Sequence, residues 1–466
     1  MSPISRTEHH RALQPRLAST VRLPSMTPTA PTIWLTTLGC AKNQVDSDKI
    51  TGMLTAAGYA EASSPESADV VMVNTCGFIE PARRESVDTI LDLAGAKRGD
   101  ASLVVVGCMA QRYEAELTEA LPEADAVLGL DRYSELVDRL DALRRWTPLT
   151  IGSARRSHMD ILYETRRPTP TTPYAYVKVA EGCDKLCTFC AIPQFRGKQR
   201  SRSPENIRDE IAELAAAGVA EIGLVAQDLA AYGRDTDAPD IVELIRYVSD
   251  VDGLRRLRLY YLYPREIRPT LIEEMTGNPI IADYFDLSLQ HASSRLLRAM
   301  KRPGSGDQHR DLIDRIRSLA PDAAMRSSFI VGFPGETDDD VDDLAAFLDD
   351  VRLDWAGFFP YSPEEGTEAA VMDHQISDSE KHTRLRHLQG VQDDITTARS
   401  IDQIGRTLTV VVDQVEDDRP VARSYREAPE IDGVILLDEG EPGEWLTVEI
   451  TGGYGTDLDA IVRGPA

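Results

Sequence analysis

The chain has 466 residues, of which 42% are hydrophobic and 27% charged, and its formal net charge is −26. This length exceeds what one hydrophobic core serves and predicts two to four domains. No stretch approaches the roughly 20 continuous apolar residues of a membrane span, so we expect no membrane partner. The acidity argues against a general nucleic-acid-binding surface, because affinity for phosphate rests on Lys and Arg.

Residues 1–31 contain four arginines but no apolar block, which excludes a secretory signal. An Arg-rich, acid-poor leader can resemble an organelle transit peptide, but we expect a disordered leader. Met26 stands just before the first expected strand, so a start codon placed too early is an alternative, and the sequence leaves open whether residues 1–25 are translated.

Residues 32–150 alternate apolar strands with helical stretches, which predicts βαβ units and a parallel α/β domain. Cys40, Cys76 and Cys108 each end an apolar run, and their spacings of 36 and 32 residues are close to the ~30-residue length of a βαβ unit. Residues that end successive parallel strands meet at one sheet edge, where such folds bind ligands. Three thiolates can hold an iron–sulfur cubane and leave one iron open.

Two other interpretations of these three cysteines remain. They could be ordinary buried residues, since free cysteine is commonly buried. They could instead bind zinc, although a structural zinc site takes four ligands and no fourth Cys or nearby His presents itself. The six cysteines of the chain fit a reducing cytoplasm better than a disulfide framework, so we expect a cytoplasmic protein.

Residues 151–173 are rich in Pro and Thr in their second half and are expected to be a linker. From 174 to 400 six strands, each followed by helix-like sequence, predict a partial TIM-type (β/α)6 barrel whose functional face is the C-terminal rim of its strands. Residues 402–466 contain short strands separated by turns, TLTVVVDQV, PVARSYREA, DGVILLD and EWLTVEITG, and predict a small antiparallel β-barrel.

A second set of three cysteines, Cys183, Cys187 and Cys190, lies in the run GCDKLCTFC directly after the first barrel strand. Three thiolates on such a loop can hold three irons of a cubane and leave the fourth for a small molecule with an amine and a carboxylate. A zinc knuckle that lacks one ligand is the alternative. Further polar residues fall at the ends or starts of barrel strands, where a cofactor could meet them, although each could equally be structural: Gln227, Asp228, Gln290, His291, Ser327 and Ser328.

From residue 32 to the end, the chain resembles the methylthiotransferases, a family of radical S-adenosylmethionine enzymes. The motifs that carry the resemblance are TLGCAKNQVDSD, NTCGFI, GCMAQRY, EGCDKLCTFCAIPQFRGKQRSR, GFPGETDDD and YSPEEGT. The resemblance implies an N-terminal cluster domain, a radical S-adenosylmethionine barrel and a C-terminal TRAM barrel. It also implies two 4Fe–4S clusters: Cys183, Cys187 and Cys190 would hold the cluster that binds and cleaves S-adenosylmethionine, and Cys40, Cys76 and Cys108 an auxiliary cluster that handles sulfur.

The implied reaction begins when an electron from a donor such as flavodoxin or ferredoxin splits S-adenosylmethionine into methionine and a 5′-deoxyadenosyl radical. That radical removes hydrogen from a substrate carbon, sulfur from the auxiliary cluster couples to the carbon, and a second S-adenosylmethionine supplies the methyl group. From their positions at the ends or starts of barrel strands, Gln227, Asp228, Gln290 and Ser328 are expected to contact the cofactor.

Two branches of the family differ in substrate. One modifies the β-carbon of an aspartate in the small-subunit ribosomal protein uS12, and the other an N6-isopentenyladenosine of tRNA. Residues 402–466 hold 15 Asp and Glu against 5 Lys and Arg, a net charge of −10, which disfavours tRNA and suits a basic ribosomal protein or the small subunit. Motifs such as AIPQFRG and YREAPEIDG point the same way. A tRNA methylthiotransferase and a metal-stabilised, non-enzymatic binding module remain as alternatives.

Overall fold

The computed structural model describes residues 30–145, 163–236 and 239–466. Nearly all of the expected leader, 1–31, and residues 151–162 of the expected linker lie outside the described residues. The rest of that linker packs against the N-terminal domain: Lys49 Nζ donates to the Thr165 carbonyl over 2.9 Å, and Arg167 pairs with Asp48 at 3.0 Å.

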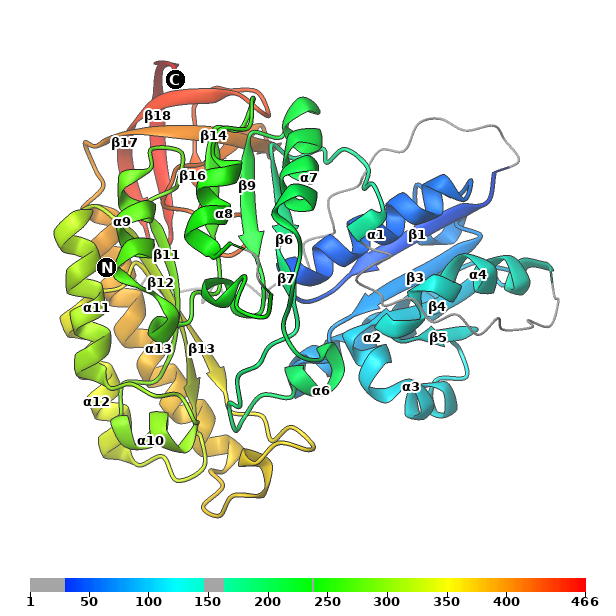
Figure 1. The fold of residues 1–466 in the computed structure, drawn as a ribbon, viewed down its shortest axis with the longest axis horizontal. Coiled ribbons are helices and arrows are strands. Elements are labelled where there is room, and N and C mark those ends of the chain that lie inside the picture. Colours follow the sequence, from blue (N-terminus) through cyan, green and yellow to red (C-terminus); the bar gives the residue numbers. More distant parts are fainter. Residues whose placement is uncertain (1–29, 146–162, 237–238) are drawn as a thin grey trace, which may run out of the picture.

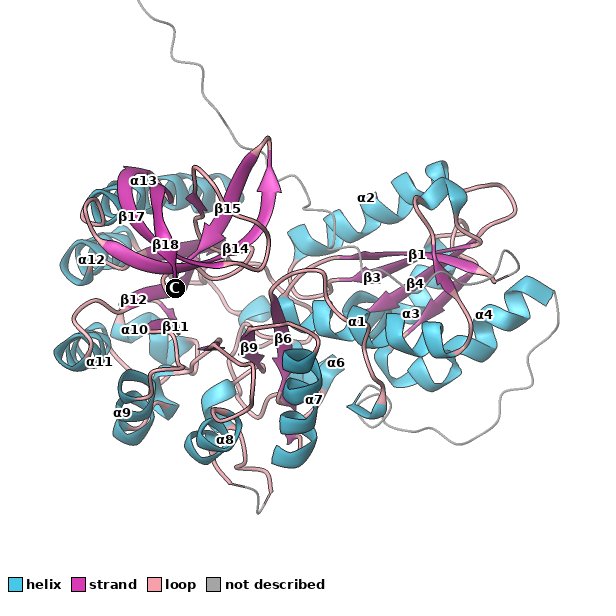
Figure 2. Cartoon of the chain, turned by 90° about the horizontal axis from the view of Figure 1, so that it is seen from above, coloured by secondary structure: helices cyan, strands magenta, loops and turns pink. Residues whose placement is uncertain are grey.

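The N-terminal domain is a five-stranded, wholly parallel sheet in the order β2-β1-β3-β4-β5. Helices α1 and α4 pack on one face and α2 and α3 on the other, and Figure 2 shows α1 and α2 on opposite sides of the sheet. Because both faces are covered, β3 and β4 are runs of buried apolar residues rather than alternating strands. The strands are β1 (Thr32–Thr37), β2 (Ala60–Glu61), β3 (Val70–Thr75), β4 (Ser102–Gly107) and β5 (Ala126–Leu128), and the helices α1 (Ala41–Ala56), α2 (Glu80–Ala96), α3 (Cys108–Ala120) and α4 (Leu136–Arg145).

The central domain confirms the expected partial barrel. Two parallel three-stranded sheets, β6-β9-β10 and β11-β12-β13, are joined by bridges from Leu257 to Ile281 and from Leu262 to Leu287, which gives one open row of six strands. These are the six strands that the sequence predicts: β6 (Tyr174–Lys178), β9 (Glu221–Val225), β10 (Arg256–Leu259), β11 (Tyr284–Gln290), β12 (Ala324–Val331) and β13 (Trp355–Pro360).

Helices cover the outside of this barrel (Figure 1). Several begin at capping side chains: Asp240 accepts from the N–H groups of Val242 and Glu243 at the start of α8, and Thr337 caps α12. The helices are α7 (Pro204–Ala216), α8 (Ile241–Val248), α9 (Pro269–Gly277), α10 (Ser294–Ala299), α11 (Gly306–Leu319), α12 (Asp338–Val351) and α13 (Asp378–Ile401). The short elements β7 (Ala180–Glu181), α6 (Ile192–Arg196) and β8 (Arg200–Ser201) flank the cysteine-rich loop.

The C-terminal segment closes into the expected small barrel, in the order β14-β15-β16-β18-β17. All its pairings are antiparallel except β16 with β18, which run parallel, and the sequence analysis did not anticipate β18. Alternate residues along each strand face inward and form the core, for example Val410, Val412, Val448 and Ile450. The strands are β14 (Thr407–Glu416), β15 (Arg419–Arg423), β16 (Ile435–Leu436), β17 (Trp445–Tyr454) and β18 (Asp457–Pro465).

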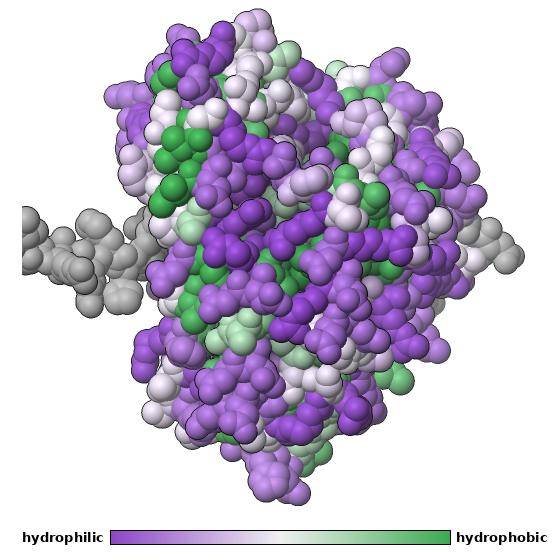
Figure 3. Space-filling view, turned by 90° about the vertical axis from the view of Figure 1, so that its left-hand side faces the viewer, coloured by the Kyte–Doolittle hydropathy of each residue, from purple (hydrophilic) through white to green (hydrophobic). Residues whose placement is uncertain are grey.

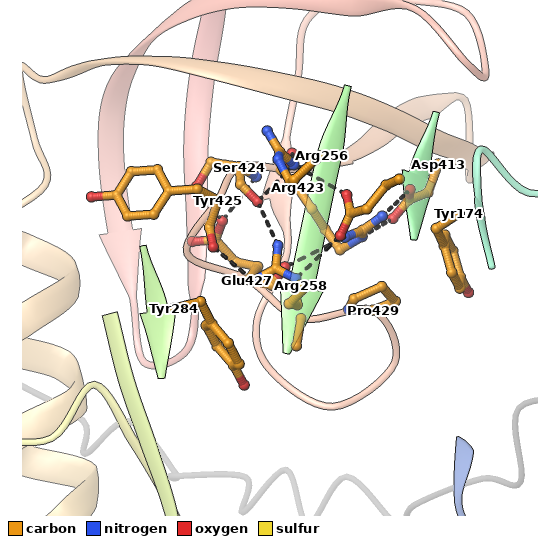
Figure 4. Close-up of polar contacts among 12 residues, drawn as sticks. Tyr174, Arg256, Arg258, Tyr284, Asp413, Arg423, Ser424, Tyr425, Glu427 and Pro429 are labelled. Carbon is orange, nitrogen blue, oxygen red and sulfur yellow. Dashed lines mark hydrogen bonds and ion pairs between the residues drawn. The ribbon is translucent and has the colours of Figure 1, made fainter. Parts of the chain in front are cut away.

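A buried cluster of charges fixes this small barrel against the central one (Figure 4). The Glu221 carboxylate accepts from Arg256 at 3.2 Å, Arg258 at 3.1 Å and Arg423 at 3.0 Å, and all four side chains are 7% exposed or less. Arg423 also pairs with Asp413. Glu221 and Arg256 are the first residues of β9 and β10. The C-terminal barrel therefore sits at the N-terminal ends of the central strands, opposite the rim on which the sequence places the chemistry.

Polar and charged residues dominate the face in Figure 3, which carries the outer helices around α11 and α12, with hydrophobic residues scattered between them. Among the described residues no helix combines the length and apolarity of a membrane span.

Candidate functional site

The structure brings Cys40, Cys76 and Cys108 together at the C-terminal edge of the N-terminal sheet. Cys40 caps α1 after β1, Cys76 follows β3, and Cys108 opens α3 after β4. The strand order places the ends of β1 and β3 at the topological switch point of a doubly wound sheet, where ligands bind. A Cβ built on Gly39 would lie 3.0 Å from the Cys76 sulfur, so the two segments touch.

The protonation of these thiols reflects their burial and their mutual proximity. Burial, together with the neighbouring Cys40 and Cys108 sulfurs, raises the pKa of Cys76 to about 12. Burial raises the pKa of Cys108 to about 11 although Arg196 opposes it. Burial also raises the pKa of Cys40, but Lys42, Arg196 and nearby backbone N–H groups bring it below its ordinary value overall. Cys40 is thus the thiol of this set that gives up its proton most readily.

Arg196, from the central domain, reaches into the N-terminal triad. Its Nη2 lies 2.9 Å from the Cys108 sulfur and donates to Asn43 Oδ1 over 2.8 Å. Its Nη1 donates to both oxygens of Glu181, over 2.8 and 2.9 Å. Arg196 is the last residue of α6, a helix that begins two residues after Cys190. One short helix therefore joins the second triad to the first.

The charges around Arg196 balance one another inside the interface. Lys178 pairs with Asp46 and lies 2.8 Å from Glu181, and Arg196 Nη2 lies 3.2 Å from Asp46. Each of these four side chains is 3% exposed or less. Two cations and two carboxylates in an enclosed space hold the N-terminal sheet in a fixed position against the barrel rim.

Cys183, Cys187 and Cys190 lie together on the loop after β7. The Cys183 N–H donates to the Gly197 carbonyl over 3.1 Å, and the Cys190 N–H to the Cys187 carbonyl over 3.1 Å. Burial, together with the neighbouring thiols, raises the pKa of Cys183 to about 11 and of Cys190 to about 12. The Arg302 guanidinium lies 3.8 Å from the Cys187 sulfur and over the Tyr263 ring.

Three of the other predicted site residues, Gln227, Asp228 and His291, have buried polar atoms that make no hydrogen bond among the described residues. Gln227 donates to Glu181 over 2.7 Å, while its buried Oε1 has no donor among the described residues. Asp228 is 2% exposed, and Lys185 Nζ lies 3.3 Å from Oδ2, yet neither oxygen has an aligned hydrogen bond from the described residues. Burial raises the pKa of Asp228, with Lys185 opposing the shift.

The remaining predicted site residues give less indication of a binding role. Gln290 ends β11 with a left-handed φ of 72° and is half-buried, as is Ser328 in β12. Ser327 accepts from the Leu289 N–H over 3.3 Å. His291 is fully buried, and its Nδ1 accepts from the N–H groups of Ala292 and Ser293, both at 3.0 Å. His291 and Ser327 therefore shape the turn after β11.

The residues fit iron–sulfur clusters and a polar small molecule. Each triad offers three sulfurs, and a Cβ on Gly77 would meet the Cys108 backbone at 2.9 Å, so glycine lets the two chain segments approach. The orphaned atoms of Gln227 and Asp228 lie where a bound molecule could satisfy them. Among the described residues, no three Cys, His, Asp or Glu side chains are arranged around a single metal ion.

Sequence reasoning missed four residues that the structure places at the thiols: Arg196, Lys42, Asn43 and Arg302. The sequence motifs could have pointed to three of them, since Lys42 and Asn43 lie in the motif around Cys40 and Arg196 lies in the motif after Cys190. Charge alone did not reveal which residues face across the domain boundary.

Comparisons with known proteins agree with this arrangement. Residues 32–129 match the Uncharacterized protein family UPF0004, residues 177–348 the Radical SAM superfamily, and residues 404–462 the TRAM domain. Among solved structures, the radical S-adenosylmethionine methyltransferase TsrM from Kitasatospora setae shares the fold with a TM-score of 0.54 at 14% identity, over 74% of each chain.

Curated relatives match over almost the whole length. The ribosomal protein uS12 methylthiotransferase RimO of Streptomyces avermitilis is 40% identical over 92% of this chain and 96% of its own. The RimO of Anaeromyxobacter sp. (strain Fw109-5) is 43% identical over 93% of this chain and 94% of its own. The chain belongs to the RimO methylthiotransferase family and is a radical S-adenosylmethionine enzyme.

Proposed function

We propose that this enzyme attaches a methylthio group to the β-carbon of an aspartate side chain in ribosomal protein uS12, using two S-adenosylmethionine molecules, a sulfur source and reducing equivalents. The observation that carries the proposal is the pair of cysteine triads joined through α6, with Arg196 in contact with Cys108. The names of the relatives support uS12 as the substrate.

The two triads have separate roles in this proposal. Cys183, Cys187 and Cys190 would hold the cluster at which S-adenosylmethionine binds, and Cys40, Cys76 and Cys108 the auxiliary cluster. When bound, these groups supply the electron, the abstraction of hydrogen, the sulfur and the methyl group. The chain binds and orients them.

Residues around the triads complete the binding site. Gln227 Oε1 and the Asp228 carboxylate would receive donors of the bound S-adenosylmethionine, because they accept no hydrogen bond from the described residues. Asp228 as a carboxylate suits an amino group. Arg302 lies beside the Cys187 sulfur. Arg196 places positive charge beside the Cys108 sulfur, which favours the thiolate form that metal binding requires.

The C-terminal barrel favours a protein substrate over a nucleic acid. Each of the five cations within residues 402–466, all of which the structure describes, is already ion-paired. The pairs are Arg406–Asp322, Arg419–Asp459, Arg423–Asp413, Arg426–Asp354 and Arg463–Glu449. Phosphate binding needs available Lys and Arg. An acidic surface instead assists encounter with a basic protein.

Mass spectrometry of uS12 from cells that lack this enzyme tests the proposal. Loss of a modification of about 46 Da, the mass that a methylthio group adds when it replaces hydrogen, is expected, and re-expression should restore it. Persistence of the modified uS12, together with loss of a methylthio group from tRNA, would instead identify a nucleic-acid substrate.

A further inference from the structure

Lys42 is a buried cation on the rim side of the N-terminal domain. It lies two residues after Cys40, in the first turn of α1, and is 7% exposed. Its Nζ lies 3.3 Å from the centroid of the Tyr261 ring. Tyr261 follows β10, at the C-terminal rim of the barrel, with a left-handed φ of 60° that its bulky side chain disfavours. Lys42 thus occupies the place where the auxiliary triad meets the rim.

Within the described part of the chain, Lys42 differs from the other buried lysines because no carboxylate pairs with it. The other three all have carboxylate partners: Lys49 with Glu210, Lys178 with Asp46 and Glu181, and Lys381 with Asp378. Buried charges are normally paired, because an uncompensated ion loses its hydration. An ammonium has three donors, and the face of one aromatic ring satisfies it only in part. A buried cation with no carboxylate partner among the described residues therefore indicates a further anionic partner.

Two partners fit the position. One is the auxiliary cluster itself, since Lys42 lies close enough to Cys40 to favour its thiolate. The other is an acidic group of the substrate. An acidic group of the substrate explains the contact with Tyr261. The ring holds the ammonium at the barrel rim, where a substrate must lie to reach both triads.

We infer that Lys42, held against the Tyr261 ring, binds the carboxylate of the acidic side chain that the enzyme modifies. This inference rests on the proposed function. In an aspartate the carboxylate is bonded to the β-carbon, so binding it fixes the position of the carbon that reacts. A neutral base such as adenine would leave the buried ammonium unpaired, so the same contact selects an acidic protein side chain.

Binding of two peptides to the reconstituted enzyme with S-adenosylmethionine tests this role. One peptide carries the uS12 loop with its aspartate, and the other has asparagine at that position. Wild type should bind the aspartate peptide about ten- to a hundredfold more tightly, the range for a charge-assisted hydrogen bond. Lys42→Met should abolish the difference, whereas Lys42→Arg should keep part of it. Lys97→Met is the control and should keep the whole difference, because Lys97 lies at the end of α2 and its Nζ donates to the Ala101 carbonyl.

Iron content separates the two partners of Lys42. The inference requires that Lys42→Met keeps the iron content of wild type while it loses the preference for aspartate. A variant that loses about half its iron would make Lys42 a cluster residue and overturn the inference, as would a Lys42→Met enzyme that still prefers aspartate. If wild type leaves both peptides unmodified and uS12 is unmodified in cells, the proposed function fails. If active wild type binds both peptides equally, only the role of Lys42 fails.

Discussion

Arg196→Met removes the guanidinium that connects the loop of the second triad to the residues around the first. Breaking a buried ion pair by removing one partner costs about 3–5 kcal/mol, because the other charge stays buried. Here Glu181 would keep Lys178 at 2.8 Å and the Gln227 amide at 2.7 Å. Asp46 would also keep Lys178. We therefore expect the lower end of that range, about 3 kcal/mol, confined to the interface between the N-terminal sheet and the barrel rim.

Hydrogen exchange measures this local loss, because amides report the free energy of opening of the segment that contains them. Peptides of α1 and the start of α3 should exchange roughly a hundredfold faster at 3 kcal/mol, while peptides of the C-terminal barrel stay unchanged. Arg208→Met is the matched control: its pair with Asp250 is exposed, so the expected loss is below about 1 kcal/mol. Equal exchange in Arg196→Met and wild type, or faster exchange throughout the molecule, would refute the role of Arg196 as a local connection.

Two further predictions concern the C-terminal barrel and the division of labour between the triads. Burial alone would raise the pKa of Glu221, but three arginines outweigh burial and lower this pKa to about 2. The Glu221 carboxylate therefore contributes about 3 kcal/mol to the free energy of unfolding. This contribution is present above the unfolded pKa near 4.5 and is lost as pH falls toward 2. Glu221→Gln should remove most of it at neutral pH, seen as an earlier denaturant transition of the tryptophan fluorescence, whereas the exposed Glu449→Gln should change stability by less than about 1 kcal/mol. Cys187→Ala should abolish formation of 5′-deoxyadenosine, and Cys76→Ala should retain some while it stops sulfur insertion; equal loss in both would contradict separate roles.

Local sequence patterns were sufficient to predict the six central strands and the convergence of Cys40, Cys76 and Cys108. Apolar runs of strand length, each followed by helix-like sequence, predicted the six central strands, because the covering helices bury the outer face of the barrel. Cys40, Cys76 and Cys108 could be placed at one edge because parallel strands share a direction. β18 was missed, since DLDAIVRGP mixes polar and apolar residues and lies at the end of the chain.

Contacts across the domain boundary could not be predicted in the same way. Arg196 and Cys108 are 88 residues apart in sequence, and Lys178 and Asp46 are 132 apart. No periodicity links such pairs, because each residue satisfies the pattern of its own element whether or not the partner is present. The sequence could therefore predict which residues end strands, but not that Arg196 crosses to the first triad or that Lys42 contacts the Tyr261 ring.

The position of the C-terminal barrel limits what its charge can do. It contacts the N-terminal ends of β9 and β10 through Glu221, Arg256 and Arg423, whereas both triads lie at the C-terminal ends of their strands. Its acidic surface can thus steer a basic partner toward the enzyme, since such attraction acts at a distance, but it is on the wrong side to choose the atom that reacts. That choice has to be made at the rim, where the buried Lys42, with no carboxylate partner in the described part of the chain, contacts Tyr261 beside Cys40.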